Sequence, residues 1–470
     1  MNLTRRSFFG VSAALPFGIP LAVRAADPVS IRIDPARRLP AVPADYMGLG
    51  YEISSVAVPG LLSGKNNAYV RLVRNLGRSG VIRVGGNTSD FSSYDPRGEA
   101  KSLPKATVVN DANFRELRTF LDATGWKLIW GINLGGNRLD NAVAEARAIV
   151  ETMGDRLLAL EIGNEPDLFV QAGHRKEPYG YAEWLAEYRR YKTAIRAQLP
   201  RVPFAGPDLA GRGIDWMANF ARDEGRDAVL LTAHHYIQGQ ANPTSTLELM
   251  LQEEKKFQPA LAQFQAASQS AHLPWRMCET ASYSGGGKEG VSNTFAASLW
   301  VLDYLFVLAG YGCAGVNMET GVNHLGWVSH YTPIGDDLAG HFNSAPEYYG
   351  LLAFAKAGFG ERLGVMLDAA GVNLTAYATE RNGETMVTAI NKDLARAAAV
   401  EVSGIPFHRA EAWRLRAPSL SATSGVTFAD ATVGGDGVWS GGKTETVRIS
   451  GANALLDVPA ASGVVIRLRS

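Results

Sequence analysis

The segment LALEIGNEPDLF, from Leu158 to Phe169, decides how the fold is interpreted, because it begins as an apolar strand and ends in polar residues. Pro166 cannot donate a backbone hydrogen bond, so the strand ladder is expected to stop beside Glu165. A second segment, PWRMCETASYSGGG from Pro274 to Gly287, has the same design: a strand-like run delivers Glu279, and small polar residues follow. The organisation of the rest of the chain decides whether these two glutamates meet.

Between about residue 44 and residue 357, strand-like apolar runs alternate with segments of helical periodicity. The eight expected strands are Tyr46–Ile53, Val81–Gly85, Lys127–Leu134, Leu157–Gly163, Val202–Pro207, Ala228–Tyr236, Trp275–Thr280 and Cys313–Glu319. The expected helices include Asn113–Ala123, Asn141–Met153, Tyr181–Gln198, Leu247–Ala267 and Thr294–Ala309. This alternation implies a parallel sheet in an α/β fold, and eight such units match a (β/α)8 TIM barrel. A doubly wound open sheet is the alternative, but no glycine-rich phosphate loop follows the first strand.

The pattern of apolar and polar residues changes after about residue 358. Short alternating runs are separated by Gly, Asn, Asp and Ser, and no helical segment intervenes, which predicts a C-terminal β-sandwich. Ser30–Ile33 is a strand-like run without a neighbouring partner, so we expect it to join that sandwich. The expected parts are a signal peptide (1–26), an N-terminal strand that joins the sandwich (27–42), the barrel (43–357) and the sandwich (358–470).

The N-terminus MNLTRRSFFG carries the pair Arg5 and Arg6, and an apolar run from Gly10 to Val23 follows. With Ala25 and Ala26 as the cleavage site, this pattern predicts a bacterial twin-arginine export signal and a periplasmic or secreted protein. No other run is long and apolar enough to span a bilayer, so no membrane association is expected after cleavage.

Charge and cysteine content narrow the class of protein further. Removal of residues 1–26 leaves 43 basic against 46 acidic residues, a net charge of −3. A nearly neutral chain has no global field that attracts nucleic acid, so no nucleic-acid partner is expected. Two cysteines, Cys278 and Cys313, exclude a disulfide-based scaffold, and the sequence leaves open whether they are bonded.

The two glutamates suit the chemistry of glycoside hydrolysis. In a parallel barrel the active site lies at the carboxyl ends of the strands, so Glu165 and Glu279 are expected on the same face. Two carboxyl groups about 5–5.5 Å apart perform retaining hydrolysis, one as nucleophile and one as acid/base. Asn164 can hydrogen-bond a sugar 2-hydroxyl, and Tyr236 can donate to Glu279 and keep it ionised as the nucleophile. The nearby charge of Glu279 then raises the pKa of Glu165, which suits an acid.

Several motifs in order resemble glycoside hydrolase clan A and, within it, family 79, the β-glucuronidase and heparanase group. They are GLGYEIS, IRVGGNTSD, EIGNEPDLF, HHY and CETASYSGGG, followed by a late β-sandwich. The resemblance covers essentially the mature chain. It implies that Glu165 is the acid/base and Glu279 the nucleophile, and that Glu52 and Asn87 contact the sugar hydroxyls.

A glucuronidase must also bind the carboxylate on C5 of its sugar. Segment Ala314–Asn343 contains no Lys or Arg, so this loop cannot supply a guanidinium clamp. We expect the backbone N–H groups of Gly285 and Gly286, with the hydroxyls of Tyr283 and Tyr331, to bind the carboxylate instead.

The sequence therefore predicts an exported retaining β-glycosidase, an exo-acting β-glucuronidase that hydrolyses terminal glucuronic acid from a carbohydrate substrate. An endo-acting, heparanase-like enzyme, another clan A glycosidase such as a xylosidase or arabinofuranosidase, and a non-catalytic carbohydrate-binding barrel remain alternatives. No cofactor is expected. No metal is expected either, because His234 and His235 are adjacent on a strand and point in opposite directions.

Overall fold

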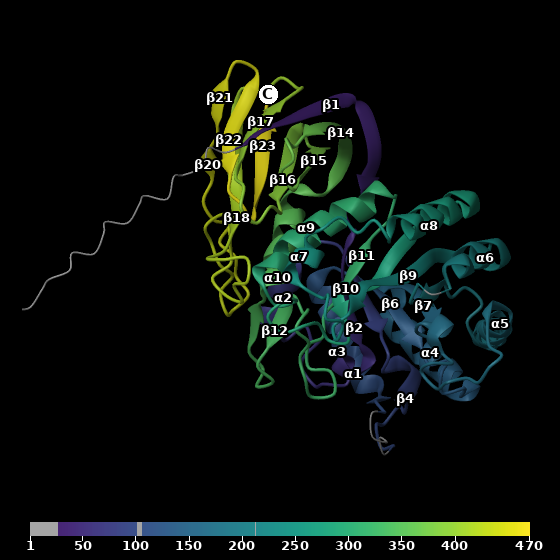
Figure 1. Cartoon of the computed structure of the whole chain (residues 1–470). Helices are drawn as coiled ribbons and strands as arrows, with labels where there is room; N and C mark the ends of the chain where they lie inside the picture. The colour runs from purple at the N-terminus through teal and green to yellow at the C-terminus, as the bar shows by residue number, and fades with distance from the viewer. Residues whose placement is uncertain (1–26, 101–105, 212) are drawn as a thin grey trace, which may run out of the picture.

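A computed structural model of the chain describes residues 27–100, 106–211 and 213–470. It consists of an α/β barrel, at the lower right in Figure 1, and a β-sandwich above it on the left. The expected export signal at residues 1–26 lies outside the described residues. Within the described ranges, no helix has the length and apolar character needed to cross a bilayer.

Eight parallel strands close the barrel in the order β2-β3-β6-β7-β8-β9-β10-β11, after which β11 pairs with β2. Their bounds are β2 Met47–Glu52, β3 Val81–Gly85, β6 Lys127–Ile132, β7 Leu157–Ile162, β8 Phe204–Leu209, β9 Ala228–Gly239, β10 Trp275–Ser284 and β11 Val316–Glu319. Each predicted strand corresponds to one of these, so the predicted barrel is confirmed and the open sheet is wrong. Strands such as β6 are buried beyond their first residue because helices cover the barrel, which explains their continuous apolar runs.

Helices follow the barrel strands and pack on their outer surface (Figure 1). The longer ones are α2 Asn67–Asn75, α3 Asp111–Thr124, α4 Leu139–Met153, α5 Tyr181–Gln198, α6 Ile214–Glu224, α8 Gln258–Ala271, α9 Phe295–Gly310 and α10 Pro346–Ala357. Short helices are α1 Ile53–Val56, α7 Leu247–Met250, η1 Ser89–Phe91, η2 Gly154–Arg156 and η3 Pro166–Leu168. Two small ribbons are added in loops, β4 Ser93–Tyr94 with β5 Val108–Val109 and β12 Ile334–Asp336 with β13 Phe342–Ser344.

The single helix predicted over Leu247–Ala267 is wrong. The structure has the short α7, which Thr246 caps through a hydrogen bond from Leu249 N, and then the separate α8. Pro259 lies in the first turn of α8, where a missing N–H costs nothing. In the interior of a longer helix the same proline would remove a hydrogen bond and clash with the preceding turn, so the helix restarts there.

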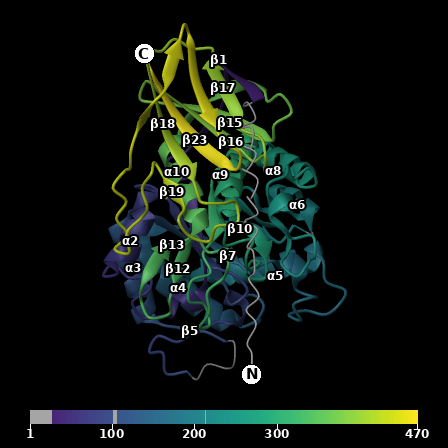
Figure 2. The ribbon, with the colours of Figure 1, turned by 60° about the vertical axis from the view of Figure 1, so that its left-hand side comes forward.

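The C-terminal sheet curls into the predicted sandwich, in the order β19-β18-β23-β16-β15-β14-β1-β17-β22-β21, with β20 pairing with β18. Its strands are β1 Asp27–Val42, β14 Gly360–Asp368, β15 Leu374–Arg381, β16 Glu384–Asn391, β17 Ala398–Ser403, β18 Arg409–Arg416, β19 Thr427–Phe428, β20 Glu445–Thr446, β21 Arg448–Ser450, β22 Asn453–Val458 and β23 Ser462–Arg469. Figure 2 shows the C-terminus at the upper end of this sheet.

Strand β1 comes from the other end of the described chain and lies inside this sheet. It pairs antiparallel with β14 and parallel with β17, and its pairing with β14 shifts register between Asp34 and Arg38. The alternating side chains of Val29, Ile31 and Ile33 are buried in the sandwich core. The N-terminal strand therefore belongs to the sandwich, as the fold prediction stated.

Helix α9 joins the two parts of the molecule. Most of its side chains are buried, because the barrel covers one side and the sandwich and α10 cover the other. Asp303 on this helix accepts hydrogen bonds from Thr375, Tyr377 and Lys392 of the sandwich, at 2.6, 2.7 and 2.5 Å. Phe306 stacks on Tyr377 with ring centroids 4.4 Å apart. The barrel and the sandwich thus share one interface with a buried ion pair at its edge.

Candidate active site

A cavity of about 770 Å³ opens at the carboxyl ends of the barrel strands. Its walls come from the ends of β2, β9 and β10 and from the loops that follow β3, β7, β8, β10 and β11. The lining residues are Glu52, Asn87, Asp90, Asn164, Glu165, Leu168, Gln171, Ala172, His174, Ala210, Tyr236, Gln238, Gly239, Glu279, Ser284, Gly285, Gly286, His324, Trp327 and Tyr331. Both glutamates singled out in the sequence therefore face the same space.

Glu165 lies just beyond β7, where the chain leaves the barrel sheet. Its backbone has φ 52° and ψ 53°, a left-handed conformation that is unfavourable for a residue with a Cβ, and Pro166 then begins η3. The Glu165 N–H donates to the carbonyl of Asp208 at 3.0 Å, which fixes this turn. The sharp turn moves the side chain out of the strand and into the cavity.

Glu279 lies within β10, and both of its carboxylate oxygens accept hydrogen bonds. Arg83 Nη1 donates to Oε2 at 2.7 Å, and Tyr236 Oη donates to Oε1 at 2.7 Å, which is the contact expected from the sequence. Charge-assisted bonds of this kind stabilise a carboxylate anion. The donors around Glu279 therefore hold its carboxylate in place, as a nucleophile requires.

The two carboxyl groups approach closely. One oxygen of Glu165, one of Glu279 and one ring nitrogen of His234 all lie within 4.8 Å of one another. This spacing matches the about 5–5.5 Å separation of retaining glycosidases and is too short for the about 6.5–9.5 Å that inverting enzymes use to admit water.

The electrostatic surroundings of Glu165 differ from those of Glu279. Burial raises the pKa of Glu165, the charge of Glu279 raises it further, and the hydrogen bond from His234 opposes both effects. A raised pKa keeps Glu165 protonated at a higher pH, as a general acid requires. The geometry thus gives the two glutamates different chemical characters.

A fully buried arginine forms the floor beneath both glutamates. Arg83, from β3, contacts Glu161 Oε2 at 3.2 Å, Asp208 Oδ2 at 2.5 Å and Asn164 Oδ1 at 2.8 Å, in addition to Glu279. Gly85 allows this arrangement, because a Cβ there would lie 2.5 Å from the guanidinium carbon. Arg83 therefore connects Glu279 to the buried acids beneath the site.

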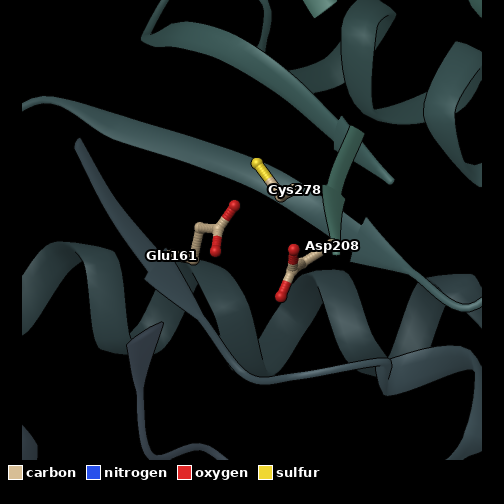
Figure 3. A group of neighbouring side chains, drawn as sticks. All are labelled: Glu161, Asp208 and Cys278. Atoms are coloured by element: carbon tan, nitrogen blue, oxygen red, sulfur yellow. The ribbon is translucent and has the colours of Figure 1, made fainter. Parts of the chain in front are cut away.

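Figure 3 shows Glu161, Asp208 and Cys278 facing one another in this floor. Their ligand-type atoms lie within 4.8 Å of one another, a spacing that could hold a metal ion. The guanidinium of Arg83 already contacts both carboxylates, so the protein itself supplies the positive charge that this trio needs. Cys278 and Cys313 are both free and buried.

Three of the predicted substrate-binding residues lie on the β2 and β7 side of the cavity. Glu52 accepts hydrogen bonds from the backbone N–H groups of Asn87 and Thr88, so it also caps the end of β3. Burial, and then the charge of Glu279, raise the pKa of Glu52 to about 7. Asn87 lines the cavity, and Asn164 does so with Arg83 holding its Oδ1.

The loop after β10 places Gly285 and Gly286 at the cavity wall, beside the segment that carries Tyr331, since His330 N donates to the carbonyl of Gly286. Gly286 has φ 93°, and a Cβ there would meet the Trp327 ring at 2.8 Å, so this position requires glycine. Tyr331 packs against Tyr236 with ring centroids 6.1 Å apart. These three predicted residues therefore share one wall with Trp327.

The prediction that Tyr283 faces the substrate is wrong. Strand β10 continues to Ser284 instead of ending near Thr280, so Tyr283 is still a strand residue and its ring is fully buried. Its hydroxyl donates to the carbonyl of Thr246 at 2.7 Å, outside the cavity. Lys288, the one cation near this loop in the sequence, does not line the cavity either.

Sequence reasoning missed two contributors to the site. His234 was considered only as a metal ligand, but its Nδ1 lies 3.0 Å from Glu165 Oε1 and its Nε2 lies 2.7 Å from Asp208 Oδ1. In the sequence, Asp208 follows the apolar run FAGP near the end of β8, just as Glu165 and Glu279 each follow a strand-like run. That repeated placement of an acid after an apolar strand is the signal that could have found it.

No family model matches the chain. The fold is similar to that of a 4-O-α-L-rhamnosyl-β-D-glucuronidase from Fusarium oxysporum, with a TM-score of 0.76 and 19% identity over 93% of this chain and 100% of the other. The barrel, with one glutamate after its fourth strand and one in its seventh, defines a glycoside hydrolase of clan A.

Two curated proteins are similar to the chain in sequence. A β-glucuronidase from Aspergillus niger is 27% identical over 391 residues, which cover 74% of this chain and 71% of the relative. A β-glucuronidase from Neurospora crassa is 28% identical over 377 residues, which cover 69% of this chain and 66% of the relative.

Proposed function

We propose that the protein is a retaining, exo-acting β-glucuronidase. The observation that carries this proposal is the approach of Glu165 and Glu279 within 4.8 Å in one cavity at the carboxyl ends of the barrel strands. The names of the relatives from Aspergillus niger and Neurospora crassa support glucuronic acid as the sugar.

The reaction proceeds in two displacements at the anomeric carbon. In the first, Glu279 forms a bond to this carbon while the bond to the leaving oxygen breaks, and Glu165 gives its proton to that oxygen. In the second, Glu165 takes a proton from water, the water oxygen attacks the anomeric carbon, and Glu279 is released. Two inversions return the sugar in its original β configuration.

The sugar carboxylate is bound without a cation from the cavity wall. Among the described residues that line the cavity there is no Lys or Arg. The backbone N–H groups of Gly285 and Gly286 make no hydrogen bond to another described residue, and with the hydroxyl of Tyr331 they are the donors available to a carboxylate. The raised pKa values of Glu52 and Glu165 reduce the negative charge around a uronate at mildly acidic pH.

The test is a comparison of aryl glycosides under identical conditions. The protein is incubated with 4-nitrophenyl β-glucuronide, β-glucoside, β-xyloside and α-L-arabinofuranoside, and the released 4-nitrophenol is measured. We expect kcat/KM for the glucuronide to exceed the others by at least about 10²-fold, because donors built for a carboxylate are left unpaired by the analogues. A preference for xyloside or arabinofuranoside would replace the proposal with another clan A activity, and no cleavage at all would indicate a binding protein.

An endo-acting enzyme on sulfated polysaccharides is the less favoured candidate. Sulfated chains need cations along an extended cleft, and none lines the described cavity wall. Incubation with heparan sulfate, followed by size-exclusion chromatography, separates the two: an exo enzyme leaves the chain length of the polymer nearly unchanged, whereas an endo enzyme shortens it.

We also propose that residues 1–26 direct export by the twin-arginine route. The support is the Arg5–Arg6 pair followed by an apolar run and small residues at Ala25 and Ala26. In a bacterial host, Arg5→Lys with Arg6→Lys should move the enzyme from the periplasmic to the cytoplasmic fraction. An unchanged distribution would rule this route out.

A further inference from the structure

The contacts of His234 point to a role beyond the two glutamates. His234 lies on β9 and is buried, and both of its ring nitrogens face carboxyl groups. Nε2 lies 2.7 Å from Asp208 Oδ1, and Nδ1 lies 3.0 Å from Glu165 Oε1. Asp208, His234 and Glu165 therefore form a continuous chain that ends at the proposed acid/base.

Asp208 is held as a carboxylate at the far end of this chain. Burial raises its pKa, but the charges of Arg83 and His234 outweigh burial and lower the pKa to about 2. A carboxylate only accepts hydrogen bonds, so Nε2 of His234 must carry a hydrogen. Nδ1 lies 3.0 Å from Glu165 Oε1 and 3.8 Å from Glu279 Oε2, so a hydrogen on Nδ1 has carboxyl oxygens within reach. Burial alone would lower the pKa of His234, but Asp208 and Glu279 raise it well above its usual value, which favours a ring that carries both hydrogens.

This protonation state decides which oxygen of Glu165 holds the catalytic proton. When Nδ1 carries a hydrogen, it donates to Oε1 across the 3.0 Å contact, and the proton of the neutral carboxyl group then lies on Oε2. Oε2 has no hydrogen bond to any other described residue, which leaves it available to the leaving oxygen of a substrate. With a neutral His234 whose only hydrogen is on Nε2, Nδ1 would instead accept the Glu165 proton at Oε1, away from the substrate.

We propose that Asp208 is a positioning residue: it keeps His234 doubly protonated, and His234 in turn directs the Glu165 proton to Oε2. The same imidazolium stabilises the Glu165 carboxylate after the proton has moved to the leaving oxygen. At that point Glu279 is esterified to the anomeric carbon and has lost its charge, and His234 remains in hydrogen-bond contact with the new anion.

Charged groups from several strands face His234 and contribute to its state. They are Arg83 on β3, Glu161 on β7, Glu165 after β7, Asp208 on β8 and Glu279 on β10, the last with Oε2 3.8 Å from Nδ1. Of these, only Asp208 contacts Nε2 as a hydrogen-bond acceptor. Removal of the Asp208 charge therefore weakens the hold on the Nε2 hydrogen of His234, and no other group in this set can replace Asp208 as its acceptor.

The test uses Asp208→Asn and rests on the proposed function only in its choice of substrate. The amide keeps the shape and one acceptor but not the charge. We expect the basic limb of the kcat/KM profile to move to higher pH by about one unit, because the loss of the nearby cation raises the pKa of Glu165. We also expect kcat/KM to fall by about 10²-fold for a poor leaving group such as phenol and much less for 2,4-dinitrophenol, which needs no proton.

Two further variants keep the test decisive. His234→Gln removes the cation itself, so it should move the basic limb in the same direction, and it carries the test if Asp208→Asn does not fold. His235→Gln changes the neighbouring histidine of β9, whose Nε2 bonds Glu254 at 2.9 Å and which does not line the cavity, so its profile should coincide with the wild type. Folding of each variant is checked by its Tm.

A folded Asp208→Asn enzyme with an unmoved basic limb and equal losses for all leaving groups would overturn the proposal. A shift in His235→Gln as large as that in Asp208→Asn would do the same, because it would reveal an effect that does not depend on contact with Glu165. These outcomes are independent of the sugar preference, since all variants are compared on whichever aryl glycoside the wild-type enzyme cleaves.

Discussion

Glu165 and Glu279 are more than a hundred positions apart in the sequence, yet their carboxyl groups share one cavity. The left-handed backbone at Glu165 and the fixed donors around Glu279 are local features with a chemical consequence. Burial and the charge of Glu279 raise the pKa of Glu165, which favours its protonated form. The carboxylate of Glu279 instead accepts hydrogen bonds from Arg83 and Tyr236. The two residues can therefore be distinguished experimentally.

Azide distinguishes the two roles. Glu279→Ala and Glu165→Ala should each lower kcat by at least about 10³-fold without unfolding the protein. Azide should rescue Glu279→Ala by occupying the vacated nucleophile position, and one displacement gives the α-glucuronosyl azide. With Glu165→Ala, azide attacks the glycosyl-enzyme and gives the β-azide. NMR of the products decides between them, and the opposite anomers would exchange the two roles.

The residue-level features that the sequence did not reveal depend on contacts across the barrel. An acid after an apolar strand identified Glu165 and Glu279, and the same pattern was present but unused at Asp208. The inward contact of Arg83 with Glu279 required the strand register, because it joins β3 to β10. Tyr283 was misplaced because the length of β10 beyond Glu279 depends on its pairing with β9, through Tyr283 and Gln238, and not on local sequence.

At the scale of single elements, a hydrogen bond between two buried side chains, Glu145 of α4 and Trp130 of β6, joins the helix to the strand. Glu145 is fully buried, its Oε1 accepts a hydrogen bond from Trp130 Nε1 at 2.9 Å, and its Oε2 has no partner. Burial raises the pKa of Glu145 to about 7, although the Trp130 bond lowers it. The folded protein therefore holds a proton on Glu145 in a pH range where the unfolded chain releases it.

The stability of the fold should fall with pH because of this residue. The loss begins near the unfolded pKa of about 4.5 and is complete just above 7. Glu145→Gln does not titrate, so the variant does not lose this stability as the pH rises. The free energy of unfolding of the variant minus that of the wild type should therefore be higher by about 2 kcal/mol at pH 8 than at pH 5. Urea denaturation at both pH values measures this difference.

The matched control lies on the same helix. Glu151→Gln changes an exposed side chain of α4, so its effect should be within about 0.5 kcal/mol at both pH values. If Glu145→Gln behaved like this control, the buried carboxyl group would have to be ionised in the folded state.

At the scale of the whole molecule, the interface between barrel and sandwich depends on Asp303. Its carboxylate is the partner of Lys392, whose side chain is only 4% exposed. Asp303→Ala should therefore lower the free energy of unfolding by about 3–5 kcal/mol, because it leaves Lys392 buried without a counter-ion. Arg38→Ala breaks the exposed pair with Glu380 and should cost less than about 1 kcal/mol. Equal effects in chemical denaturation would mean that the interface charge is solvated.

The architecture could be predicted from the sequence because the spacing of apolar residues shows which side chains are buried and whether a segment is a helix or a strand. Eight apolar runs separated by helical segments allow few arrangements, and the parallel barrel is one of them. The curled order of the sandwich strands could not be predicted, since each strand is short and many pairings bury the same alternating side chains. The split of α7 and α8 was missed because Pro259 was included in a helical pattern that it interrupts.

Strand β1 has a consequence for the order of events during synthesis. Its two neighbours, β14 and β17, are encoded more than three hundred residues later, so β1 emerges from the ribosome long before either partner exists. The sandwich cannot close until nearly the whole polypeptide has been made, whereas the barrel strands find their neighbours progressively. Completion of translation is thus a precondition for the last stage of folding, and a product truncated before β14 would contain neither neighbour of its first strand.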